Sequence, residues 1–149
     1  MMVHAVQLLT AFIGSLGFAI LFHVPKNHLF SASLGGFFSW GIYLFGVDVG
    51  LGIFLSCLFA SAFSALYAEI LARVKRAPAV LFFIPAVIPL VPGSNLYYTM
   101  LGIGTEDWVS AKVNAVLTLQ YALSIALGIS VMWAVLSIAR SIREKRNAS

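Results

Sequence analysis

Residues 84–98 decide the fold of this chain, and they read Ile84-Pro85-Ala86-Val87-Ile88-Pro89-Leu90-Val91-Pro92-Gly93-Ser94-Asn95-Leu96-Tyr97-Tyr98. Three prolines and a glycine lie here inside an apolar run that is long enough to cross a bilayer. Each proline removes a helical hydrogen bond and clashes with the preceding turn. In hydrocarbon the freed backbone groups find no water, so such a break persists only where protein or an aqueous cavity surrounds it. Because transporters bind their cargo at broken helices, the stretch predicts a binding site within a membrane protein.

The composition of the whole chain is that of a membrane protein. Of its 149 residues 61% are hydrophobic and 9% are charged, and the mean hydropathy is +1.00. Five apolar segments approach or exceed the roughly 20 residues that span a hydrocarbon core. We expect helices at residues 3–22, 29–46, 49–72, 79–104 and 113–139. The expected fold is an all-α integral membrane domain over residues 1–149 with five transmembrane helices, the fourth broken by the Pro/Gly-rich turn.

Basic residues predict the orientation of these helices. Eight of the nine Lys and Arg residues fall in the first loop, the third loop and the C-terminal segment: Lys26, Arg73, Lys75, Arg76, Arg140, Arg143, Lys145 and Arg146. Lys112 alone is expected in the fourth loop. With five spans the three basic sites share one side, which the positive-inside rule makes cytoplasmic. The N-terminus is therefore expected outside and the C-terminus inside, with the basic residues facing lipid headgroups rather than nucleic acid.

Small residues recur at every fourth position on three of the expected helices. They are Ala11, Ser15 and Ala19, then Ser31, Gly35 and Ser39, then Ser56, Ala60, Ser64 and Ala68. Small side chains let helix backbones approach closely in a membrane, so we expect these faces to be buried. The chain has no evident internal repeat, whereas many transporters have two related halves. We therefore expect a homo-oligomer or a partner subunit.

The proline-rich stretch also predicts unpaired backbone groups. Pro85, Pro89 and Pro92 leave the carbonyls of the residues four positions earlier without their usual donors, and these carbonyls belong to Leu81, Pro85 and Ile88. Acceptors for an ammonium group or a cation are therefore expected on the inner side of the break.

Beyond the prolines, a new helix is expected to begin. Gly93 accepts a positive φ, and Ser94 and Asn95 are good N-caps. The N–H groups of that helix and its positive dipole end would then face the break. Donors and acceptors together suit a zwitterionic amino acid or a small carboxylate. The alternative is a structural kink whose polar groups are satisfied by neighbouring helices.

For several further polar residues the sequence leaves two roles open. Tyr97 and Tyr98 are interfacial anchors or cavity residues. Asn114, Thr118 and Tyr121 share one face of the last helix, where they line a path or bond to another helix.

Glu69 is the one acid within an expected span, and it precedes Arg73 by four residues. The spacing favours an ion pair on one helix face. The alternative is a role in proton coupling, since ionisable residues inside membranes are functional hypotheses by default.

The sequence shows no sign of catalysis. His4, His23 and His28 lie at membrane edges without an acid or a cysteine at ligand spacing, so we expect no metal site. No phosphate loop, dinucleotide fingerprint or nucleophile elbow is present. We therefore expect no cofactor and no enzymatic activity.

The proline-rich motif resembles a known family. Residues 84–94, followed by Tyr97-Tyr98-Thr99-Met100, resemble the hallmark of the threonine/serine exporter family, and the length and span number resemble its small-subunit half. The resemblance implies secondary export of small hydrophilic solutes, with threonine and serine as the named substrates and small carboxylates in related split systems. It also implies the bacterial cytoplasmic (inner) membrane and a larger partner subunit that supplies the complementary half.

The function expected from these observations is that of an exporter subunit. It would move threonine/serine-like amino acids or small carboxylates out of the cell, driven by the membrane potential or a proton gradient. The alternative is an accessory subunit that stabilises a membrane complex without transporting.

Overall fold

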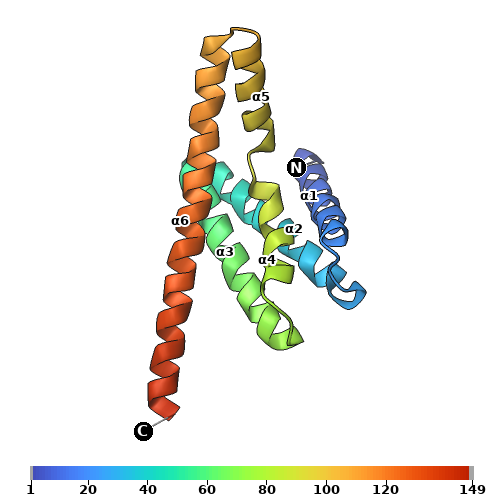
Figure 1. Ribbon diagram of the computed structural model, residues 1–149, viewed down its shortest axis with the longest axis vertical. Helices are drawn as coiled ribbons and strands as arrows, with labels where there is room; N and C mark the ends of the chain where they lie inside the picture. The colour runs from blue at the N-terminus through green and yellow to red at the C-terminus, as the bar shows by residue number, and fades with distance from the viewer. Residues whose placement is uncertain (1, 148–149) are drawn as a thin grey trace.

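The computed structural model describes the chain from residue 2 to residue 147, with side chains from residue 3 to residue 142. Every regular element in this range is a helix (Figure 1). The elements are α1 (Met2–Leu21), α2 (Lys26–Asp48), α3 (Gly52–Lys75), α4 (Val80–Val87), the short 3-10 helix η1 (Ile88–Leu90), α5 (Gly93–Gly104) and α6 (Trp108–Asn147). The basic residues Arg143, Lys145 and Arg146 lie outside the described side chains.

The expected all-α fold is confirmed for the described residues, although α6 is longer than its predicted span and the fourth predicted span is divided into α4, η1 and α5. Helices α1, α2, α3 and α6 are each long and apolar enough to cross a membrane. A fifth span is obtained when Val80–Leu90 and Gly93–Gly104 are counted together, although they meet at an angle of 52°. The chain is therefore a multi-pass membrane protein.

Several loop boundaries were predicted wrongly. Lys26 begins α2, Arg73 and Lys75 end α3, and Arg140 lies within α6, so these basic residues lie at or near helix ends rather than in loops. Lys112 lies within α6 and not in the fourth loop, because α6 already begins at Trp108. The carboxylate of Asp107 accepts a hydrogen bond of 3.1 Å from the backbone N–H of Ser110 and so caps the first turn of α6.

Helices α1 to α4 with η1 form a bundle in which α2 packs on α1, α3 and α4. The small-residue faces are inside it, as expected, since Ser15, Ala19, Ser39 and Ala60 are fully buried. The hydroxyls of Ser39 and Ser64 lie 2.7 Å apart across the α2–α3 contact.

Helix α5 and the first turns of α6 (residues 93–118) form a hairpin that rises beyond the bundle in Figure 1. Within this hairpin α5 packs on α6, where Gly102 faces the backbone of Asp107 and Ala111. Further along, α6 packs on α3, with Gly128 against Ser61. The lower part of α6 thus belongs with the bundle, whereas its upper part carries α5 away from it.

Candidate functional site

The break in the fourth span lies beside a small cavity. This cavity has a volume of about 240 Å³, and it is lined by Gln7, Thr10, Ala11, Trp40 and Pro89. Three helical elements meet here, namely α1, α2 and η1. We call it the Pro89 cavity.

Two polar atoms on residues that line this cavity lack a hydrogen-bond partner. The amide oxygen of Gln7 and the indole N–H of Trp40 are both buried without a hydrogen-bond partner in the described part of the chain. Leaving such an atom unpaired costs about 1–3 kcal/mol. Thr10 differs from them, because its hydroxyl already contacts the carbonyls of Val6 and Gln7. The cavity therefore offers one acceptor and one donor to a small polar solute.

An aromatic series holds the Trp40 ring in place. Trp40 stacks on Tyr43 with ring centroids 4.8 Å apart, and the Tyr43 hydroxyl hydrogen-bonds the hydroxyl of Tyr121. This bond joins α2 to α6, and it assigns Tyr121 to interhelical bonding, one of its two expected roles. A ligand that bonds to Trp40 is thereby linked to α6.

The expected capping of the outer half-helix is wrong. Helix α5 begins at Gly93 with Pro92 as its N-cap residue, and no side chain caps it. Ser94 and Asn95 lie inside the first turn instead, because the extended Val91 and the fixed ring of Pro92 already end the preceding turn.

Two backbone details of the break also differ from expectation. The carbonyl of Ile88 is not unpaired, because the 3-10 geometry of η1 lets it accept the N–H of Val91 at 3.1 Å. Gly93 is not one of the residues with positive φ, whereas Gly50 and Gly52 in the α2–α3 turn are, with φ of 86° and 76°. The break is thus a 3-10 turn, two non-helical residues, Val91 and Pro92, and then the outer helix.

The remaining candidate residues lie outside the Pro89 cavity. Pro85 is buried in the bundle, where its carbonyl faces Gly36. Tyr97 and Tyr98 are 61% and 52% exposed and pack edge to face on each other. Asn114 and Thr118 bond to carbonyls of their own helix, those of Ser110 and Asn114. Of the ten residues suggested around the break, Pro89 alone is among those that line this cavity.

The four other cavity residues, Gln7, Thr10, Ala11 and Trp40, were not among the candidate site residues. Gln7 and Thr10 had a signal, since two polar residues one turn apart in an apolar span are costly unless they face a partner. The sequence contained no such signal for Trp40, because a tryptophan in an apolar helix usually packs against other helices or lipid.

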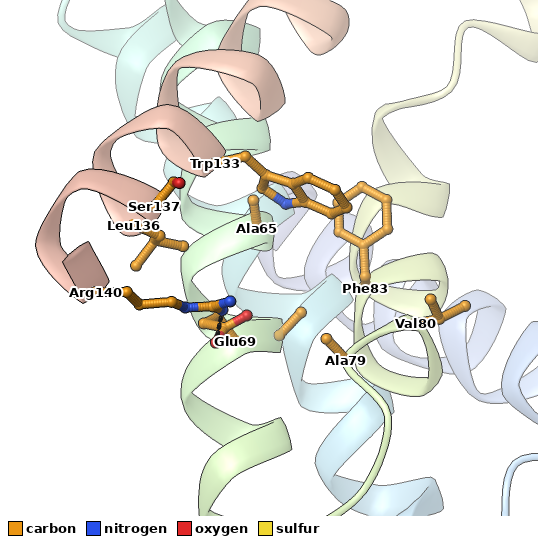
Figure 2. A pocket seen from close by; sticks show the side chains of 10 residues that line it. Ala65, Glu69, Ala79, Val80, Phe83, Trp133, Leu136, Ser137 and Arg140 are labelled. Atoms are coloured by element: carbon orange, nitrogen blue, oxygen red, sulfur yellow. Dashed lines mark hydrogen bonds and ion pairs between the residues drawn. The ribbon is translucent and has the colours of Figure 1, made fainter. Parts of the chain in front are cut away.

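A second and larger cavity surrounds Glu69 at the other end of the bundle (Figure 2). Its volume is about 350 Å³, and α3, α4 and α6 contribute its walls. The Glu69 carboxylate accepts a 3.0 Å hydrogen bond from Arg73 and a second one from Arg140 of α6. The expected Glu69–Arg73 ion pair is confirmed, and the contact with Arg140 was not foreseen. We call this the Glu69 cavity.

The helices of residues 2–147, four or five of which can span a membrane, define a multi-pass membrane protein. A small cavity beside a broken helix is a feature that many transporters share. The family model described as "Threonine/Serine exporter, ThrE" matches residues 7–135. The chain therefore belongs to the threonine/serine exporter family, as the proline-rich motif had suggested. Membership indicates a transporter rather than an enzyme. No solved structure matches this chain.

Proposed function

We propose that this chain is a subunit of a secondary exporter that moves small hydrophilic solutes, namely threonine/serine-like amino acids or small carboxylates, out across the bacterial cytoplasmic membrane. The observation that carries the proposal is the pair of unpartnered polar atoms, Gln7 Oε1 and Trp40 Nε1, in the Pro89 cavity. A solute with a hydroxyl or ammonium donor and a carboxylate acceptor satisfies both of them. Its binding is favoured because both atoms are already desolvated.

The same proposal includes an orientation and a partner. The charge distribution supports an N-terminus outside and a C-terminus inside. The hairpin leaves Ser94, Tyr97 and Tyr98 exposed, so a larger membrane subunit or a second copy is proposed to cover them and to complete the path. Asn95, Asn114 and Thr118, which belong to the same hairpin, would then also line that path.

The test is efflux from cells that carry the chain and its membrane partner. Cells are loaded with threonine by feeding a threonine-containing peptide, and the release of threonine is followed over time. Trp40→Phe removes the indole donor but keeps an aromatic ring, and Gln7→Leu removes the amide. Each loses one hydrogen bond to the solute, so we expect the half-saturating internal concentration to rise about threefold to tenfold.

Two exposed residues supply matched controls for these substitutions. Trp108 is 58% exposed and Gln120 is also exposed. Trp108→Phe and Gln120→Leu therefore make the same two side-chain replacements at positions outside the cavity. Both are expected to transport normally. Normal transport by Trp40→Phe and Gln7→Leu at normal membrane levels would refute the binding role of the cavity.

A second function is favoured by the hairpin. Its exposed apolar surface suits an accessory subunit that stabilises or gates a transporting partner. In that case substitutions at Pro89, Gly93 or Asn95 would leave transport intact, and packing substitutions at Gly35 or Ala60 would abolish it. The two functions therefore predict opposite results from the same efflux assay.

A further inference from the structure

The Glu69 cavity carries charges of both signs, unlike the Pro89 cavity. Glu69 and Arg140 both line it, and they come from different helices, α3 and α6. Figure 2 shows their charged ends meeting at the floor of the cavity, with the rings of Trp133 and Phe83 above. A volume of about 350 Å³ lies within the range of small-molecule sites.

The two arginines that bind Glu69 are not equivalent. Arg73 lies one turn from Glu69 on α3, at the i,i+4 spacing, so the helix itself keeps the two residues adjacent. Arg140 reaches Glu69 from a different helix, α6, whereas the two arginine side chains are similarly exposed, at 51% for Arg73 and 52% for Arg140. Arg140 is therefore the partner that a competing carboxylate can take, while Arg73 remains beside Glu69 on α3.

We propose that the Glu69 cavity is a loading site for a zwitterionic amino acid. The carboxylate of this solute forms an ion pair with Arg140, and its ammonium group forms an ion pair with Glu69. The exchange replaces one ion pair by two, and the aromatic rings of Trp133 and Phe83 cover the solute. This inference rests on the proposed export function, because an exporter needs a site that is open to its basic, cytoplasmic side. Binding breaks the ion pair between α3 and α6, while the packing of the two helices around Gly128 and Ser61 is kept.

The test uses the fluorescence of Trp133 in the full chain, reconstituted in phosphatidylcholine nanodiscs. The chain has three tryptophans, and a Trp40→Phe/Trp108→Phe background leaves Trp133 as the reporter. This background also removes the indole donor of the Pro89 cavity. A response of Trp133 to L-serine is therefore separate from the efflux result: loading without efflux refutes the proposed function alone, and efflux without loading refutes this inference alone.

L-serine is expected to shift Trp133 emission saturably. Serine methyl ester lacks the carboxylate and lactate lacks the ammonium group, so each is expected to bind about tenfold more weakly or worse. Arg140→Gln and Glu69→Gln are expected to weaken serine binding by a similar factor, and Arg140→Lys, which keeps the charge, by about threefold. Arg76→Gln and Glu106→Gln are the controls, because neither residue lines the cavity.

Three results would overturn the inference. Serine binding that is unchanged in Arg140→Lys and Arg140→Gln excludes a role for the guanidinium, and the conservative variant guards against loss of folding. Equal binding of lactate and serine identifies a simple anion site. A shift produced by phosphatidylglycerol nanodiscs, and by no amino acid, identifies a lipid site.

Discussion

The bundle and the hairpin both consist mainly of apolar and small residues, but they differ in which of these residues are buried. In the bundle α2 and α3 bring glycine, alanine and serine together, and Ser33, Ser39, Ser61 and Ser64 are fully buried. On the hairpin Gly102 and Ala111 are the buried residues of 93–118, and large side chains such as Met100 and Val109 are 68% and 76% exposed. Close backbone contact thus holds the bundle together, whereas the hairpin presents side chains to its surroundings.

This difference separates stability from assembly. In a membrane there is no hydrophobic force between helices, so association depends on close packing and on interhelical hydrogen bonds. The bundle has both within one chain. The hairpin has one close contact and a wide apolar surface, which lipid or another subunit must cover. Disruption of the bundle should therefore unfold the protein, and disruption of the hairpin should change its partners.

The largest effect is expected from Gly36→Leu in the bundle. A Cβ at Gly36 would overlap the Ser15 hydroxyl and lie 3.0 Å from the Pro85 carbonyl oxygen, so α2 would be forced away from both α1 and α4. Overpacking of this kind costs about 1–3 kcal/mol and more where backbone must move. Thermal unfolding in detergent, followed by circular dichroism, should show a large fall in Tm. Gly17→Leu is the control, since nothing lies within 4 Å of its Cβ position; equal Tm values for the two variants would contradict the packing argument.

A smaller, local effect is expected from Gly102→Leu in the hairpin. A Cβ there would lie 2.9 Å from the Ala111 nitrogen and from the Asp107 carbonyl oxygen, both of which are backbone atoms. We expect α5 to separate from α6 while the Tm of the bundle stays close to wild type. Spin labels at Tyr97 and Val116 in a Cys57→Ser background should report a longer and broader distance distribution. Gly104→Leu, with open space at its Cβ position, should leave that distribution unchanged.

The contrast between the two regions was only half predictable from the sequence. The i,i+4 series of small residues on α2 and α3 correctly identified the buried faces, since small side chains at this spacing are typical of closely packed membrane helices. The position of α5 was not predictable, because which helices meet is not encoded in the pattern of a single helix. At the site, Pro89 was found from proline chemistry, whereas Trp40 reaches the cavity only through the α1–α2 packing.

The local details of the break illustrate a second limit. The proline positions required a disrupted helix, and a bend of 52° is present. They did not determine how the disrupted groups would be satisfied. A 3-10 turn pairs Ile88 with Val91, so local backbone geometry replaced the side-chain caps that Ser94 and Asn95 had suggested. Capping by Ser or Asn requires that this residue take the N-cap position with non-helical backbone angles. Here Pro92, whose ring fixes φ, occupies the N-cap position instead.

A finer test of the bundle is a double-mutant cycle on Ser39 and Ser64. Their hydroxyls are 2.7 Å apart, and each also lies within hydrogen-bonding distance of a carbonyl of its own helix, that of Gly35 and that of Ala60. Because each hydroxyl has one proton, the one that donates to the other serine gives up its local bond. Hydrogen bonds between membrane helices have coupling energies of about 0.6 kcal/mol on average. We expect Ser39→Ala, Ser64→Ala and the double variant to give a coupling near this value by unfolding in denaturing detergent. Strict additivity would show that the local bonds alone account for both serines; exposed Ser94→Ala should be neutral.

The smallest effect is expected at the tip of the hairpin, where Asp107 caps α6. Hydrogen bonds from the side chain and the backbone N–H of Ser110 lower the pKa of the Asp107 carboxyl below its ordinary value of 3.8. Because the folded pKa is depressed, the capping contribution is fully present above the unfolded pKa and is lost as the pH falls through the folded one. The amide proton shift of Ser110, followed by NMR from pH 7 to pH 2, should stay flat above about pH 5 and change below the ordinary value.

Asp107→Asn separates the cap from its charge. Asparagine caps helices about as well as aspartate, so this variant should keep the Ser110 hydrogen bond and lose the pH response. Asp107→Ala should lose both, and its Ser110 amide should resemble that of the wild type at low pH. A wild-type response that survives in Asp107→Asn would mean that another acid titrates at the tip, with exposed Glu106 as the nearest candidate. In either case the Tm of the bundle should not follow this titration, since Asp107 lies in the turn between α5 and α6 and α5 packs mainly on α6.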